Sequence, residues 1–120
     1  MSFAAPFSRL HTALGRVMTL AINPGTGLSN SIHQLLRDEV RHFPEVRSAF
    51  LFGSRARGDY SPQSDIDIAI DAPTMSAATF AQLWGAIDTL PIAFPLDCVW
   101  LQALPESPLK SMIERDAVAL

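Results

Sequence analysis

The sequence predicts one α+β domain, and three observations support this. Segments 46–52, 65–70 and 96–101 are rich in β-branched, aromatic and other apolar residues, as buried strands are. Segments near 30–42 and 76–90 carry apolar residues at helical spacing. The length of 120 residues suits a single domain that buries about two thirds of its unfolded surface. No internal repeat or linker divides the chain, so we expect one compact unit.

Residues 1–25 are predicted to be an N-terminal extension to a domain over residues 26–120. Apolar residues at helical spacing allow a short amphipathic helix there; they are Phe3, Phe7, Leu10, Leu14 and Val17. The sequence slightly favours a second interpretation, in which the first 17 residues are a loosely ordered extension before a start near Met18. Basic residues interrupt the apolar run, so we expect no signal peptide.

The first helix follows a turn rich in Pro and Gly. Ser29 or Asn30 is its expected cap, and Pro44 stops it. One face of this helix is apolar and is predicted to pack on the sheet; its residues are Ile32, Leu35, Leu36, Val40 and Phe43.

The elements after this helix follow from the same periodicities. Strand 46–52 leads into Gly53, and strand 65–70 ends before a loop at Asp71–Thr74. Helix 76–90 has an apolar stripe that we interpret as core rather than as a cofactor site; it comprises Phe80, Leu83, Trp84 and Ile87. A third strand runs over 96–101. Two prolines then introduce a last helix near Leu109 to Asp116.

Composition excludes several classes of function. The net charge is −3 and the isoelectric point is near 5.4, which argues against extensive nucleic-acid binding. No apolar run is long enough to span a membrane. Cys98 is the only cysteine, so we expect a reducing cytoplasm and a buried, small apolar side chain at this position. The three histidines lack zinc-site spacing and are assigned to the surface or to helix faces.

The turn after the first strand is a candidate phosphate site. Gly53 permits a tight turn with a close backbone approach, and Ser54 adds a hydroxyl group. If residues 54–57 open a short helix, its first N–H groups also face the anion. Arg55 and Arg57 can supply positive charge for phosphate; alternatively they are solvated, or paired with an acidic residue.

Two aspartates in the second strand form a candidate metal site. Asp65 and Asp67 lie two apart, roughly 7 Å between Cα atoms in a strand, so both point to one face. Two carboxylates repel unless a cation lies between them, and hard oxygen ligands suit Mg²⁺. Asp97, an acid in an otherwise apolar strand, would complete a two-metal site. The alternative is that these acids lie on the solvated face of an ordinary strand next to a plain turn.

The motifs Gly53-Ser-Arg-Ala-Arg-Gly58 and Ser64-Asp-Ile-Asp-Ile68 together resemble the nucleotidyltransferases of the DNA polymerase β superfamily. They are most similar to the minimal nucleotidyltransferases that serve as antitoxins beside HEPN-domain toxins. The resemblance extends over about residues 26–118. It includes the stretch Met112-Ile-Glu-Arg-Asp116, after which the family usually has glycine and this chain has Ala117.

That resemblance implies a palm-like mixed sheet with flanking helices and transfer of a nucleoside monophosphate to a hydroxyl group, with AMP from ATP as the favoured case. Gly53 and Ser54 would hold the triphosphate, with Arg55 and Ser64 of the same motifs assigned to the nucleotide site. Asp65 and Asp67 would bind two Mg²⁺ ions. Asp97 would bind the catalytic ion and help to deprotonate the acceptor.

The favoured function is an antitoxin that adenylylates a partner HEPN toxin. The chain has only one helix-sized segment after Asp97, so the acceptor site is expected on another polypeptide. Two alternatives stay open. One is an antibiotic-type nucleotidyltransferase that acts on a small molecule bound by a separate subunit. The other is a non-catalytic module that neutralises its partner by binding alone.

Overall fold

The computed structural model describes residues 22–23 and 25–120. The predicted extension of 17 residues therefore lies outside the described residues, and the domain boundary at residue 25 stays a prediction. Two short strands, β1 (Ile22–Asn23) and β2 (Leu28–Ser29), pair antiparallel at the start of the described chain. The sequence did not predict this pair.

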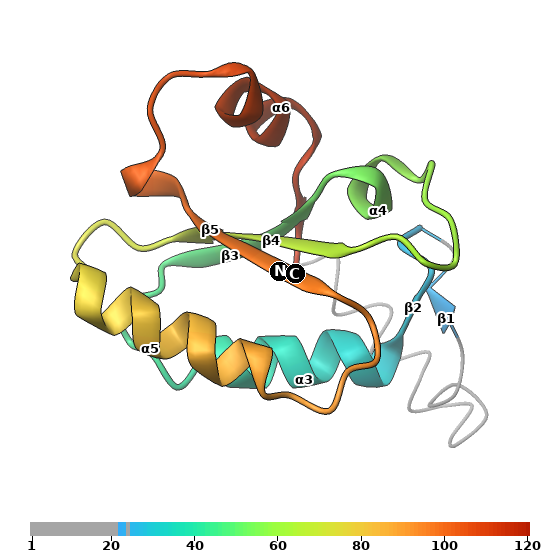
Figure 1. Cartoon of the computed structure of the whole chain (residues 1–120), viewed down its shortest axis with the longest axis horizontal. Helices are drawn as coiled ribbons and strands as arrows, with labels where there is room; N and C mark the ends of the chain where they lie inside the picture. Colours follow the sequence, from blue (N-terminus) through green and yellow to red (C-terminus); the bar gives the residue numbers. More distant parts are fainter. Residues whose placement is uncertain (1–21, 24) are drawn as a thin grey trace.

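A four-stranded mixed sheet forms the centre of the molecule (Figure 1). Its strands are β3 (Ser48–Phe52), β4 (Ile66–Asp71), β5 (Leu96–Trp100) and β6 (Val118–Ala119). The spatial order is β5-β4-β3-β6; β4 and β5 run parallel, whereas β3 is antiparallel to β4 and to β6. The predicted α+β class with a mixed sheet and flanking helices is confirmed.

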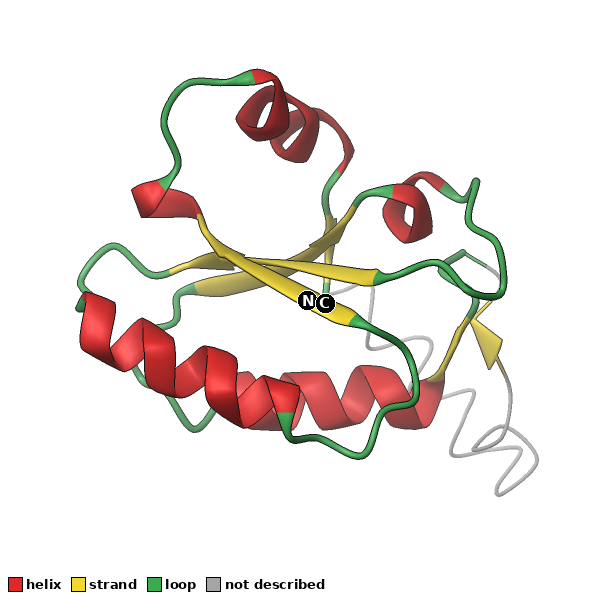
Figure 2. Ribbon diagram, viewed as in Figure 1, coloured by secondary structure: helices red, strands yellow, loops and turns green. Residues whose placement is uncertain are grey.

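Helices cover both faces of the sheet (Figure 2). On one side lie α3 (Asn30–Val40) and α5 (Ala77–Asp88), and on the other lie α4 (Ser54–Arg57) and α6 (Pro108–Asp116). A single turn of 3₁₀-helix, η1 (Leu101–Ala103), follows β5. The Ser29 and Ser76 hydroxyls accept from the N–H groups three residues on, which explains why α3 and α5 begin where the sequence predicts.

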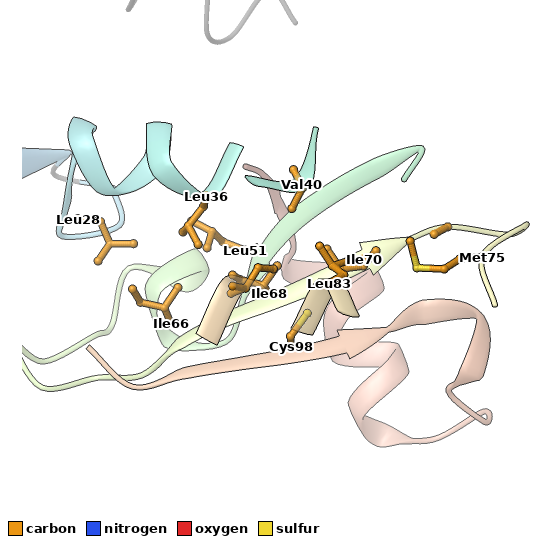
Figure 3. Packing of buried hydrophobic residues seen from close by; sticks show 12 residues of the cluster. Leu28, Leu36, Val40, Leu51, Ile66, Ile68, Ile70, Met75, Leu83 and Cys98 are labelled. Carbon is orange, nitrogen blue, oxygen red and sulfur yellow. The ribbon is translucent and has the colours of Figure 1, made fainter. Parts of the chain in front are cut away.

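The main core lies between the sheet and the helix pair α3 and α5 (Figure 3). Ile66, Ile68 and Ile70 of β4 are all fully buried and face these helices, where they meet Leu36 and Leu83. Burial of each such side chain contributes about 1.5–3 kcal/mol. A smaller cluster, formed by Phe52, Ala69 and Ile113, packs the other face against α6. β4 therefore sends alternate residues to opposite layers.

The structure adds two features that the sequence did not predict. β6 pairs with β3 at the sheet edge, and Ala117 leads into it with φ −60° and ψ 140°. This extended conformation suits alanine, so glycine is not needed there. His33, which the sequence placed on the surface or on a helix face, is buried on α3, and its Nε2 lies 2.9 Å from Thr26 Oγ1. No helix among the described residues is both long and apolar enough to cross a bilayer.

The buried His33 predicts a pH-dependent stability. Burial, and then the nearby Arg37 charge, lower the pKa of His33 to about 4 from 6.5. The unfolded chain therefore binds more protons between these values, and the free energy of unfolding falls as the pH drops from about 6.5 to about 4. We expect a loss on the order of 2 kcal/mol.

Chemical denaturation of His33→Gln and of the wild type at several pH values measures this loss. Glutamine retains a polar partner for Thr26 but does not titrate, so the difference between the proteins should change with pH in this window. His42→Gln, at an exposed histidine, is the control. A difference that is the same at every pH would contradict the prediction.

Candidate functional site

Two of the three predicted metal ligands lie side by side on neighbouring strands. Asp67 of β4 is the register partner of Asp97 on the parallel strand β5. Neighbouring strands are about 4.8 Å apart, so the two carboxylates start from adjacent points on one face. Asp65 is exposed and directly precedes β4. This face is the one that carries α4 and α6, opposite the main core.

The electrostatics of Asp67 show that the acids act on one another. Burial raises the pKa of the Asp67 carboxyl, the Asp97 and Asp65 carboxylates raise it further, and only Arg57 lowers it. A neighbouring carboxylate disfavours the charged form of Asp67, whereas a neighbouring guanidinium group favours it. A cation bound here would relieve the repulsion and favour ionised Asp67.

The donor chemistry of the three aspartates fits Mg²⁺, which prefers carboxylate oxygens together with water and phosphate. Among the residues that the structure describes, however, no group of three or more His, Cys, Asp and Glu side chains is arranged as a complete metal site. One oxygen of Asp97 accepts a hydrogen bond from the Cys98 backbone N–H at 3.0 Å. The metal assignment of Asp65, Asp67 and Asp97 therefore stays a prediction.

Gly53 joins β3 to α4 and lies against Asp67. Its φ of 74° and ψ of −153° belong to a region that essentially only glycine occupies. A Cβ atom at this position would overlap the Asp67 carboxylate. The site therefore requires glycine both for the backbone turn and for the space beside the acid.

Ser54 begins α4 next to this turn. Its carbonyl oxygen accepts from the N–H groups of Gly58 and Asp59, at 2.9 and 3.2 Å. Within the described chain its hydroxyl group makes no hydrogen bond. The N–H groups of Ser54 and Arg55 precede the first bonds of α4, which Ala56 and Arg57 donate to the Gly53 carbonyl oxygen. These groups are the donors that the sequence predicts for a phosphate. Their contact with a phosphate stays a prediction.

The Arg55 side chain points into the protein, and its assignment to the nucleotide site stays a prediction. Its side chain is 1% exposed and donates to backbone carbonyl oxygens on two sides: to Thr26 at 2.9 Å and to Ser64 at 3.0 and 3.1 Å. The Tyr60 and Phe94 rings lie 5.2 and 4.7 Å from the guanidinium carbon. Arg55 thus fastens α4 to the loop that carries Asp65, because its donors are used inside the protein.

Ser64 also has a structural role in the loop. Its hydroxyl accepts from the Ser61 N–H at 2.8 Å, and its carbonyl oxygen accepts from Arg55. These bonds fix the backbone immediately before Asp65. Ser64 therefore shapes the approach to β4, and its contact with a nucleotide stays a prediction.

Arg57 is the cation that lies near the acidic residues. Its Nε is 3.1 Å from an Asp59 oxygen, its Nη1 lies 3.7 Å from the Met112 sulfur on α6, and its charge acts on Asp67. The sequence allows Arg57 either to bind phosphate or to pair with an acid, and the structure shows the pair with Asp59. Residues 55 and 57 lie about 200° apart around a helix, which explains why one is buried and the other is exposed.

Cys98 behaves as the sequence predicts. It is 5% exposed, belongs to the main core, and points to the face opposite Asp97. Burial, and then the neighbouring Asp97 charge, raise the pKa of its thiol to about 12. A thiol in this state is a poor nucleophile, so Cys98 contributes packing rather than chemistry.

The chain is similar to known proteins in three comparisons. Residues 32–119 match the family described as "Polymerase beta, Nucleotidyltransferase". A protein of Methanocaldococcus jannaschii named "Putative protein adenylyltransferase" is 28% identical over 87 residues, which cover 71% of this chain and 83% of that protein. A crystal structure described as a putative nucleotidyltransferase from Sulfolobus solfataricus has a TM-score of 0.48 and 22% identity, covering 74% of this chain and 76% of that one.

Replacement of Gly53 by alanine should be more damaging than replacement of Gly58. Both glycines have positive φ, 74° and 90°, but a Cβ atom at Gly58 would meet nothing within 4 Å. We expect Gly58→Ala to cost about 1–2 kcal/mol for the backbone alone. Gly53→Ala should cost about 3 kcal/mol, because the Asp67 carboxylate must also move. Equal losses in urea unfolding would show that the contact with Asp67 is unimportant.

Removal of the Arg55 guanidinium should destabilise the fold strongly. Arg55→Met leaves the Thr26 and Ser64 carbonyl groups without their donor, and we expect a loss of about 3 kcal/mol. Arg57→Met, the matched change two residues away, removes an exposed pair with Asp59 and a long contact with Met112, and it should cost about 0.5 kcal/mol. Urea unfolding of the two variants tests this difference, and a smaller loss for Arg55→Met would refute the structural role.

Proposed function

The chain belongs to the polymerase beta nucleotidyltransferase family, and from this premise we propose that it transfers AMP from ATP to a hydroxyl group of a partner protein. One observation supports the proposal above all: Asp67 and Asp97 are register partners on one face of the sheet, next to Gly53. The name of the M. jannaschii relative supports a protein as the acceptor.

In the proposed reaction the acceptor oxygen attacks the α-phosphorus of ATP. The bond from that phosphorus to the oxygen bridging to the β-phosphate breaks, and pyrophosphate leaves. The Ser54 hydroxyl and the N–H groups that begin α4 bind the triphosphate oxygens, while Gly53 allows them to approach the backbone closely. Asp97 takes up the proton that the acceptor hydroxyl loses.

The three aspartates would hold the metal that this chemistry needs. Asp65, Asp67 and Asp97 would hold Mg²⁺, which would neutralise phosphate charge and lower the pKa of the attacking hydroxyl. Asp67 is the acid on which both other carboxylates act, since each of them raises its pKa. Arg57 lies close enough to act on Asp67 and provides additional positive charge for an anionic substrate.

The acceptor in this proposal is a HEPN-domain toxin, and this chain is its antitoxin. The proposal follows the resemblance of the two motifs to minimal nucleotidyltransferases that act beside such toxins. A hydroxyl group presented by another polypeptide would complete the site.

Replacement of Asp67 by asparagine should abolish the transfer. We expect the rate to fall at least about 100-fold, because the amide keeps the shape but loses the charge that binds the metal. Intact-protein mass spectrometry of the partner encoded beside this gene, after incubation with this protein, ATP and Mg²⁺, measures the reaction. Asp65→Asn should behave in the same way.

Asp88→Asn, at an exposed acid that ends α5, is the charge-matched control and should retain full transfer. A partner that gains AMP units with wild type and Asp88→Asn only would support the whole assignment. Full turnover with Asp67→Asn would show that the metal assignment is wrong. A stable complex without a mass change would favour neutralisation by binding, and a modified small molecule would favour the antibiotic-type reaction.

A further inference from the structure

A pocket of about 290 Å³ lies where the end of α3 meets the start of β3. Ser48, the first residue of β3, lines it, whereas Phe52 at the other end of the strand precedes Gly53. Four residue steps along a strand span about 13 Å, so the pocket and the aspartates lie at opposite ends of β3. We call it the arginine pocket, after the three arginines that line it: Arg37, Arg41 and Arg47.

The charged side chains that line the arginine pocket are all basic; Leu120, the last residue of the sequence, also lines it and adds a backbone carboxylate. None of the side chains that line it is Asp or Glu, although the whole chain has a net charge of −3. Arg37 and Arg41 are four residues apart on α3, a spacing at which like charges repel. Burial, and then the Arg41 charge, lower the pKa of Arg37, whereas Asp38 raises it. An anion in the pocket would relieve this repulsion.

The surrounding acids neutralise this charge only in part. Arg47 forms a two-bond pair with Asp71, with Nε···O 2.9 Å and Nη···O 3.1 Å. Arg41 lies 3.9 Å from Asp38, a long surface pair of little energetic value. Among the described residues, the Arg37 guanidinium donates to the Gln34 amide oxygen alone, at 3.5 Å. The Arg41 and Arg47 side chains are 70% and 67% exposed, so both can turn toward a ligand.

Apolar side chains line the pocket between the guanidinium groups. They include Val40 at the end of α3 (Figure 3), Phe43 and Val46. A ligand that uses the whole pocket must therefore combine an apolar group with negative charge. The volume is at the lower limit for small-molecule sites, which suits one inserted side chain better than a nucleotide. Arginine is also enriched among the residues that dominate protein interfaces.

We propose that the arginine pocket docks an acidic segment of the partner polypeptide, which inserts one apolar side chain between carboxylates that pair with Arg37, Arg41 and Arg47. This inference rests on the proposed function in one respect, since it takes the acceptor to be a protein. It adds the chemistry by which that protein is recognised. The docking site lies at the Ser48 end of β3, and the partner's reacting hydroxyl would reach the aspartates near Gly53 at the other end.

A defined peptide tests the docking directly. The probe is a synthetic peptide with one leucine flanked on each side by two glutamates, titrated into the full ¹⁵N-labelled chain and followed by NMR. We expect shifts in the arginine Nε–H signals of the pocket and in the backbone signals of Val40, Phe43 and Val46. A peptide with lysines in place of the glutamates, and one with alanine in place of the leucine, should bind far more weakly.

Charge reversal supplies the matched variants. Arg41→Glu should weaken binding of the acidic peptide about tenfold, whereas Lys110→Glu, the same kind of change on α6, should leave it unchanged. Thermal unfolding checks that both variants are folded. The proposal is overturned if the glutamate peptide causes no shifts at millimolar concentration, if the lysine peptide binds equally well, or if Arg41→Glu has no effect.

The docking and the transfer can fail independently. Peptide binding needs no nucleotide, so binding without any adenylylated partner would overturn the proposed function and leave the docking site in place. With an adenylylated partner in hand, Arg41→Glu should raise the KM for the partner about tenfold and leave kcat and the KM for ATP unchanged. An unchanged KM for the partner would overturn the docking site although transfer occurs.

Discussion

The alternation of side chains along β4 is the constraint on which the core and the site both depend. Ile66, Ile68 and Ile70 are fully buried beneath α3 and α5, which forces Asp67 to the opposite face. The parallel pairing with β5 then sets Asp97 beside Asp67. A slip of one residue would bury the acids and expose the isoleucines, at a large cost in hydrophobic burial and desolvation. The apolar core thus fixes the register that brings the carboxylates together.

Arg55 shows how the same motif holds its loop in place. A buried guanidinium is stable here because backbone carbonyl oxygens accept its hydrogen bonds and two aromatic rings cover it. The cost of burying its charge is offset by contacts from three separate parts of the chain. Arg57, on the other side of the short helix α4, stays near the acids. One motif therefore contains a structural arginine and an arginine available to an anionic ligand.

Charge is divided between the two ends of β3. Three aspartates gather near Gly53, and three arginines line the pocket near Ser48. In the proposed scheme the negative end binds metal and nucleotide, and the positive end binds the partner. A rigid sheet between them keeps recognition and reaction at a fixed separation, so affinity for the partner can change without changing the aspartates.

The sequence by itself determined the elements that depend on local signals. The three long strands and the helices α3, α5 and α6 were predicted to within a few residues, because apolar periodicity, serine caps and prolines act over short distances. Alternation along the strands alone predicted that Asp65 and Asp67 share one face and that Cys98 is buried on the face opposite Asp97. Only the tertiary structure decided which arginine is buried, that His33 is buried, and that β6 completes the sheet. Arg37, Arg41 and Arg47 likewise share one pocket only after α3 packs beside β3. These outcomes depend on contacts between distant segments, which no local pattern records.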